Sequence, residues 1–293
     1  MENEVFNLNR FWRYLKSDFD AFISRYGISL LVMSTMALTT DAFNGLISFF
    51  ITGEWHGMNE PLRFILYVIF AIIVLITSPA KIYGHLTDRK EGSEFLMLPA
   101  SRLEKFISMV LITCILVPFI FNLIYFGLDV LVCMVDPTCG TSMFRRLFLT
   151  DLSPILEMGG DELAEMSQYL TSIASAATPY LYFDDLIQTS LLFLLGAIIF
   201  KTSKTGKTLG CLILIGLSLE MVATPILALS FFDKFRVLAE SDFSGFTPET
   251  FQTTFPFISW VGRHLVLADT LSDTIMNCLL LFLVWLRLKK MKH

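Results

Sequence analysis

The chain has 293 residues, of which 54% are hydrophobic and 17% charged, with a formal net charge of −5 and a mean hydropathy of +0.64. A soluble domain of this length cannot bury so much apolar surface, so the composition excludes a soluble globular protein and indicates a polytopic membrane protein. The acidic balance gives no sign of a nucleic-acid partner.

An amphipathic helix is predicted at the N-terminus, over residues Phe6–Arg25. On a helical wheel its apolar residues fall in one arc of about 120°, with the charged residues outside it. We expect residues 1–25 to lie in the lipid headgroups, with the aromatic side toward the acyl chains. The alternative is an ordinary amphipathic helix that packs on protein. The apolar arc consists of Leu8, Phe11, Trp12, Leu15, Phe19, Phe22 and Ile23.

Six segments in residues 26–293 approach the roughly 20 apolar residues that a membrane-spanning helix needs. The predicted fold class is therefore all-α, with six transmembrane helices after the N-terminal interfacial helix. The third segment contains Pro118, so we expect it to be tilted, kinked or extended beyond the membrane. The six segments are Tyr26–Phe50, Leu62–Ala80, Phe106–Val135, Phe183–Phe200, Thr208–Phe232 and Leu271–Leu288.

The Lys and Arg residues predict the orientation, because they are enriched in cytoplasmic loops. With six spans and both termini inside, 16 of the 22 basic residues fall on the cytoplasmic side. The outer loops are then residues 136–182 and 233–270. The first is predicted to contain a short helix around Asp161–Ala174. The second contains an apolar stretch, residues 254–267, that is too short to span and suggests an interfacial or re-entrant segment.

No catalytic, cofactor-binding or metal-ligating motif is recognisable. The stretch SKTGKT at Ser203–Thr208 lacks the first glycine of a phosphate-binding loop, since Lys201 stands in its place. The four His residues are dispersed, and the five Cys residues show no ligand spacing and are expected to act as small buried hydrophobes. We expect no enzyme activity in this chain, so any use of ATP requires a separate subunit.

The polar loop at residues 81–106, between the second and third spans, has the most specific pattern. Ser101 and Glu104 fit a capping box, and Leu98-Pro99 keeps the chain extended before it. The capped helix is predicted to run without interruption into the third span. Upstream, the apolar run Glu94–Leu98 could insert into a cleft on a partner. The alternative is that it packs against the inner leaflet or the N-terminal helix.

The string FLMLPASRLEKFISMVL, residues 95–111, resembles the Leu-Pro-x-Ser-Arg/Lys signature of exporter-type ABC transporter permeases, particularly the small six-span members. The motif itself matches at Leu98, Pro99, Ser101 and Arg102. The resemblance implies a homodimer in the cell (inner) membrane, in which each copy contacts a cytosolic ATP-binding subunit through this loop. ATP would be bound by that partner and not by this chain. From this motif and the loop pattern together, the residues expected to couple this chain to the ATPase are Glu94, Phe95, Leu96, Leu98, Pro99, Ser101, Arg102 and Glu104.

Three acidic residues fall within or near the ends of the predicted spans. An ionised carboxylate in lipid costs several kcal/mol, so such residues are candidates for a transport pathway. Glu220 precedes Pro225 by five residues in the fifth span, where a kink would free backbone carbonyls. Asp41 and Asp129 have the alternative of a boundary position or a helix break, and Glu220 that of an interhelical hydrogen bond.

The sequence thus favours the permease subunit of an ABC exporter that carries a lipid, a hydrophobic compound or a peptide. An ion-coupled secondary transporter that uses the intramembrane acids is one alternative, although the repeated halves and paired broken helices of such carriers are not evident. A membrane scaffold that only tethers a partner is another.

Overall fold

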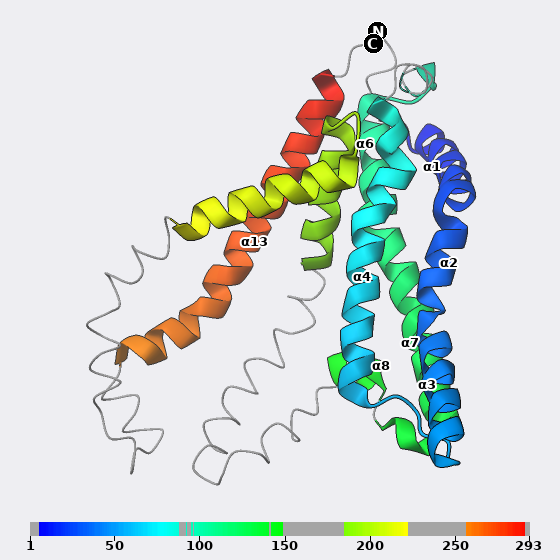
Figure 1. Ribbon diagram of the computed structural model, residues 1–293. Helices are drawn as coiled ribbons and strands as arrows, with labels where there is room; N and C mark the ends of the chain where they lie inside the picture. Colours follow the sequence, from blue (N-terminus) through cyan, green and yellow to red (C-terminus); the bar gives the residue numbers. More distant parts are fainter. Residues whose placement is uncertain are drawn as a thin grey trace.

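A computed structural model describes residues 6–87, 92, 95, 97–140, 142–148, 185–221 and 256–290. Within this part of the chain 89% of the residues are helical and none is in a strand, which confirms the all-α prediction. Several helices run side by side, whereas the last helix, α13 (Pro256–Lys290), runs obliquely to them; α1 (Leu8–Phe22), the start of α6 (Arg102–Val110) and the end of α13 meet at one end of the molecule (Figure 1).

The first helical run, Leu8–Thr52, joins the predicted N-terminal helix and the first predicted span almost without a break. It starts at the N-cap Asn7, whose side chain accepts hydrogen bonds from the N–H groups of Asn9 and Arg10. It stops at Gly53, whose φ of +79° is left-handed and suits glycine. The run consists of α1 (Leu8–Phe22), the π-helical η2 (Ile23–Gly27), α2 (Ile28–Ser34) and α3 (Met36–Thr52).

The second and third spans are separated by the polar loop. The second is α4 (Glu60–Tyr83), followed by the 3₁₀ turn η3 (Gly84–Thr87). The third combines α6 (Arg102–Val110), the π-helical η4 (Leu111–Leu116) and α7 (Val117–Val135) into 34 helical residues. Pro118 is the second residue after η4. Proline has no N–H group to donate to the helical hydrogen-bond pattern, so a π-helical segment next to it is expected. This agrees with the predicted irregularity of the third span.

The helices Asp185–Ile199 and Lys204–Met221 form a pair bent by 118°. Gly196 allows their close approach, because a Cβ atom there would lie only 1.8 Å from the Oγ1 atom of Thr208. The second helix of the pair projects away from the helices of the first three spans, on the side to which the last helix also runs (Figure 1). The last helix, α13 (Pro256–Lys290), is continuous, so the apolar stretch at 254–267 mostly extends the final span as helix.

Two short elements follow the third span: the 3₁₀ turn η5 (Pro137–Cys139) and α8 (Met143–Phe148). The predicted helix at Asp161–Ala174 lies outside the described residues, as does most of the second outer loop.

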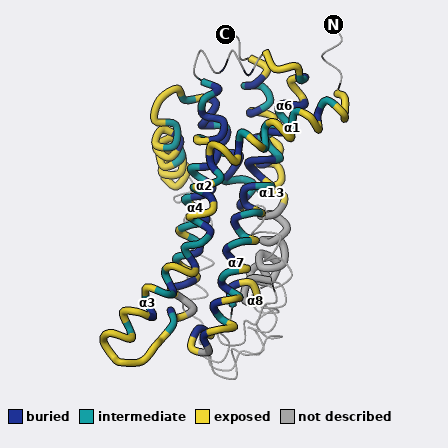
Figure 2. The backbone as a smooth tube through the Cα atoms, turned by 90° about the vertical axis from the view of Figure 1, so that its right-hand side faces the viewer, coloured by how far each residue is buried: buried dark blue, intermediate teal, exposed yellow. Residues whose placement is uncertain are grey.

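The core lies where α7 packs against α2, α3 and α4. Tyr67 is its centre, with ring centroids 5.1 Å from those of both Tyr125 and Phe126. The Tyr67 hydroxyl donates to the Asn122 side chain at 2.8 Å. Figure 2 shows buried positions along the facing sides of these helices and exposed ones along α3 and the turn after it.

Four helical segments in the described ranges are long and apolar enough to cross a membrane, and the bent pair adds a fifth if it counts as one span. They match the first, second, third and sixth predicted spans, and the bent pair covers the fourth and part of the fifth. Many large apolar side chains on α2, α3, α4 and α7 are exposed, as lipid-facing positions would be. The four segments are Leu8–Thr52, Leu62–Thr87, Arg102–Val135 and Leu271–Lys290.

Candidate functional site

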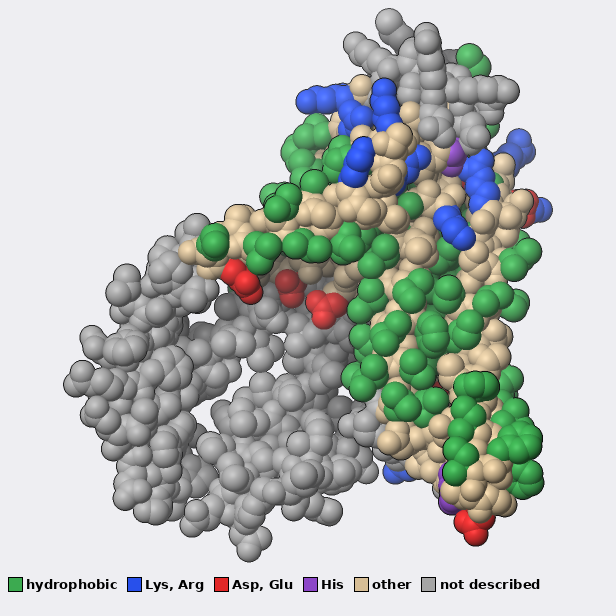
Figure 3. Space-filling model, in the orientation of Figure 1, with side chains coloured by type: hydrophobic (Ala, Val, Ile, Leu, Met, Phe, Trp, Pro, Cys, Tyr) green, Lys and Arg blue, Asp and Glu red, His purple; other side chains and the backbone are tan. Residues whose placement is uncertain are grey.

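The candidate site is the end of the molecule at which α1, η3, the start of α6 and the turn at residues 201–203 lie, here named the basic end. Figure 3 shows Lys and Arg side chains gathered there, beyond a belt of hydrophobic side chains. The Lys204 ammonium donates to the carbonyl of Gly84, so the turn between the bent helices is tied to the loop after α4. The segments predicted to be cytoplasmic therefore come together in space.

The capping box predicted at the start of α6 is confirmed. The Glu104 N–H donates to Ser101 Oγ at 3.2 Å, and the Ser101 N–H donates to Glu104 Oε2 at 2.8 Å. Both residues are buried. Because α6 continues into η4 and α7, Ser101 caps the start of the 34 helical residues that make up the third span.

The Glu104 carboxylate also anchors the N-terminal helix. The sequence analysis did not predict this contact. Arg10 donates from Nε to Oε2 and from Nη2 to Oε1, both at 2.8 Å, and the Asn7 N–H donates to Oε1 at 2.8 Å. The Glu104 side chain is fully buried. Such a two-pronged charged contact fixes orientation as well as distance. The partners are 94 residues apart, so no local pattern could reveal the pair.

A second contact ties α1 to the same elements. Asp18 accepts hydrogen bonds at its Oδ2 atom from Tyr83 at 2.7 Å and from Ser108 at 2.6 Å. Phe11 and Phe22 of the predicted apolar arc are buried, while Leu8, Trp12 and Ile23 are exposed. One part of the arc therefore packs on protein, as the alternative interpretation expected, and the other part is free to contact lipid.

The apolar run before the motif divides into a buried and an exposed part. Phe95 is buried in the core, and the Lys105 ammonium donates to its carbonyl at 2.7 Å and lies 5.0 Å from its ring centre. Met97 and Leu98 are exposed. Glu94 and Leu96 lie outside the described residues. Phe95 thus anchors the loop from within, whereas Met97, Leu98 and Pro99 are exposed among the described residues of the loop.

A groove of about 560 Å³ lies between α1 and the exposed Leu98-Pro99. Arg102 is exposed but does not line this groove, and its Nη1 atom donates to the carbonyl of Lys289 at 3.5 Å. The groove combines apolar contacts from the motif with basic and amide groups from α1, a mixture that suits a protein surface carrying acidic and apolar side chains. Its lining residues are Asn7, Asn9, Arg10, Arg13, Tyr14, Ser17, Leu98 and Pro99.

The three predicted intramembrane acids have different surroundings. Asp129 is buried and accepts from Arg63 Nη1 at 2.8 Å and from the Met143 N–H at 2.7 Å. Asp41 is buried and accepts from the Met58 N–H at 2.9 Å. Glu220 is exposed on the helix Lys204–Met221. Asp129 therefore joins α7 to α4 and α8, and Asp41 joins α3 to the turn after it, at the end opposite the basic end. The structure does not bring Glu220 together with either.

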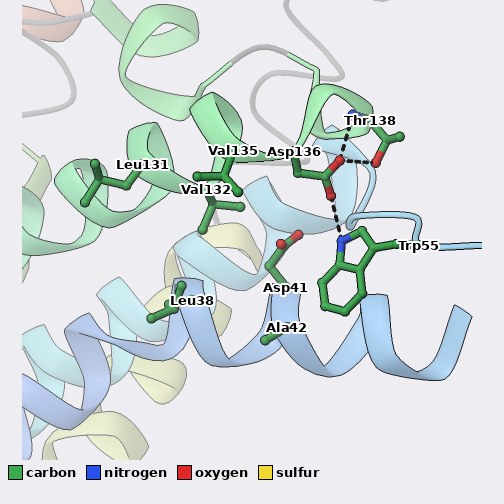
Figure 4. A pocket seen from close by; sticks show the side chains of 9 residues that line it. All are labelled: Leu38, Asp41, Ala42, Trp55, Leu131, Val132, Val135, Asp136 and Thr138. Atoms are coloured by element: carbon green, nitrogen blue, oxygen red, sulfur yellow. Dashed lines mark hydrogen bonds between the residues drawn. The ribbon is translucent and has the colours of Figure 1, made fainter. Parts of the chain in front are cut away.

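A second recess lies at this opposite end, between α3, the turn after it and the end of α7 (Figure 4). Its volume is about 550 Å³, and its walls include Leu38, Val132 and the carboxylate of Asp41. Trp55 closes one side, with its Nε1–H donating to Asp136 Oδ2 at 3.0 Å. Partial burial alone would raise the pKa of Asp136, but hydrogen bonds from Thr138 and Trp55 lower this pKa below its usual value.

Within the described residues, no group of three or more His, Cys, Asp and Glu side chains could hold a metal ion. No protein-family model matches this chain, and no curated protein or solved structure matches it.

Proposed function

We propose that the chain is the membrane-spanning permease subunit of an ABC-type exporter, driven by a separate cytosolic ATPase that docks at the basic end. The observation that carries the proposal is the motif at residues 98–104. Its exposed half, Leu98-Pro99, borders a groove, and its buried half caps a helix that continues through the third span. A partner that closes on ATP and presses on this loop would move a rigid element.

The Arg10–Glu104 contact gives this docking element a second attachment. Because Glu104 binds both its own helix cap and α1, pressure on the motif would move the N-terminal helix and the third span together. In this account α1 lies along the headgroups and acts as a lever, with Leu8 and Trp12 toward lipid.

The topology proposed with this function has six spans in the cell (inner) membrane, with both termini in the cytoplasm. Six spans require the two helices of the bent pair, which together count as at most one candidate span in the described ranges, to belong to separate fourth and fifth spans, with the basic turn at residues 201–203 on the cytoplasmic side. The grouping of Lys and Arg at one end supports this orientation. A homodimer is proposed from the family resemblance alone.

An ion-coupled carrier has less support. Of the acids that such a carrier would use, Asp129 is engaged by Arg63 and a backbone N–H, and Asp41 accepts from a backbone N–H. These contacts are those of structural residues. A scaffold that only tethers its partner would share the docking loop, but it would not need a rigid connection from that loop into a span.

The test is the partner's ATPase activity in reconstituted complexes. Arg102→Ala and Leu98→Ser alter exposed side chains of the motif, so they should leave the fold intact. We expect each to reduce ATP hydrolysis at least several-fold relative to the wild-type complex. Phe95 is unsuitable because its side chain is buried.

The matched control is Lys201→Ala, which removes an exposed basic side chain from the same end of the molecule but outside the motif. It should hydrolyse ATP at the wild-type rate. Equal activity in the motif variants and the control would remove the docking assignment.

A further inference from the structure

Two of the five cysteines, which the sequence analysis predicted to be small buried hydrophobes, lie together in the structure. The Sγ atoms of Cys133 and Cys139 are 3.0 Å apart, which leaves no room for another atom between them. Cys133 lies in the last turns of α7 and is partly exposed, and Cys139 ends η5 and is buried. A disulfide needs a sulfur–sulfur distance of about 2.05 Å, so these atoms must approach by only about 1 Å.

The surrounding contacts hold the two sulfurs in place. Arg63 donates from Nη1 to Cys133 Sγ at 2.9 Å and from Nη2 to the Cys139 carbonyl at 2.5 Å. Asp129 fixes the same guanidinium at 2.8 Å. The turn between the cysteines is closed by backbone bonds from Asp136 to Val132 and from Cys139 to Asp136. One side chain therefore bridges both ends of the turn.

The pair lies at the end opposite the basic end, since Cys133 and Cys139 adjoin in sequence Val132 and Thr138, which line the recess beside Trp55 and Asp136. In the orientation proposed above this end faces the exterior, where disulfides form and persist. That orientation is the only element shared with the proposed function. The other cysteines are Cys114 in η4, Cys211 in the bent pair and Cys278 in α13.

We propose that Cys133 and Cys139 form an intramolecular disulfide on the outer face of the protein. The oxidant is a disulfide of the extracytoplasmic compartment, carried by an oxidoreductase or a small thiol. Deprotonated Cys133 attacks one sulfur of this disulfide, forming a mixed disulfide and releasing one thiolate of the oxidant. Deprotonated Cys139 then attacks Cys133 Sγ and releases the second thiolate. The protein loses two electrons and two protons, and the oxidant is reduced to two thiols.

The order of attack follows from exposure, since Cys133 is the more accessible of the two. Burial raises the pKa of the Cys139 thiol, so this group is poorly suited to the first, intermolecular attack. The bond would tie the end of α7 to the turn that carries Thr138, and so fix the Asp136–Trp55 wall of the recess.

The experiment counts reactive thiols in the full-length protein. Native membranes are quenched with acid, denatured and treated with a maleimide, with or without prior reduction, and the protein is analysed by mass spectrometry. We expect three of the five cysteines to react before reduction and all five after it. Trypsin should release residues 106–145 as one peptide with three cysteines, carrying one label before reduction and three after.

Single variants identify the pair. Cys133→Ser and Cys139→Ser should each raise the number of reactive thiols from three to four, while the control Cys211→Ser should leave two. Five labels in the unreduced wild-type protein would overturn the proposal. So would a disulfide that joins two copies of the peptide, or protection that persists in both serine variants.

A reporter fused after the C-terminus gives the orientation separately. A cytoplasmic reporter together with five reactive thiols refutes the disulfide and leaves the proposed function standing. An external reporter refutes the shared orientation. If three thiols are reactive but no ATPase accompanies the purified protein, only the proposed function is refuted.

Discussion

The buried pair of Arg63 and Asp129 provides the most quantitative test, because the two main functional classes make opposite predictions for it. Both side chains are at most 6% exposed, and the Nη1–Oδ1 distance is 2.8 Å. In the permease account the pair is structural, and Asp129→Asn leaves the guanidinium without its counter-charge. Removing one partner of a buried ion pair typically costs about 3–5 kcal/mol of unfolding free energy.

The double variant Arg63→Met/Asp129→Leu should be less damaging than either single one. It removes both charges and leaves the Cys139 carbonyl and the Met143 N–H without these partners. At about 1 kcal/mol for each lost hydrogen bond, the expected cost is about 2 kcal/mol. The two single effects are therefore strongly non-additive.

Equilibrium unfolding of the detergent-solubilised protein measures these differences. Glu220→Gln is the matched control, because it neutralises an exposed acid in another predicted span and should change the stability by less than about 0.5 kcal/mol. If Asp129→Asn is as stable as the control, or if the Arg63 and Asp129 effects simply add, the structural role is wrong. Asp129 would then be available as an ion site.

Three further outcomes are expected. Asp136→Asn should be less stable than wild type at neutral pH, and this difference should shrink as the pH falls through the usual carboxyl pKa of about 4 and below it, because the pKa is lowered in the folded state; a pH-independent difference in melting temperature would contradict this. Gly196→Leu should cost about 1–3 kcal/mol through overlap with Thr208, whereas Gly206→Ala, with no atom within 4 Å of its Cβ, should not show this steric penalty; similar unfolding curves would refute the close approach. Ser101→Ala should cost about 1 kcal/mol through loss of the N-cap bond, measured by the same unfolding assay; an unchanged midpoint would count against the capping box as an anchor of α6.

Local patterns in the sequence predicted local structure well. The Ser101–Glu104 box depends on residues three apart, and the long apolar segments depend on composition, so both could be read without a fold. The irregularity near Pro118 follows in the same way from a missing N–H group.

Contacts between distant residues could not be predicted in this way. The position of Arg10 outside the apolar arc predicted a contact with lipid headgroups. Its guanidinium instead binds Glu104, because α1 packs against α6. Phe95 and Leu98 belong to one apolar run, but packing in the core separates their roles. Hydropathy also gave no sign of the 118° bend, which needs a glycine opposite Thr208.

The central claim, that this chain works with a cytosolic ATPase, is tested most directly by purifying the tagged protein from native membranes and identifying what accompanies it. The account predicts a soluble ATPase in equal amount, lost when the exposed Met97 and Leu98 are replaced by serine and retained in Lys201→Ala. Recovery of the protein alone, or with partners that neither bind nor hydrolyse ATP, would contradict it and favour the carrier or the scaffold.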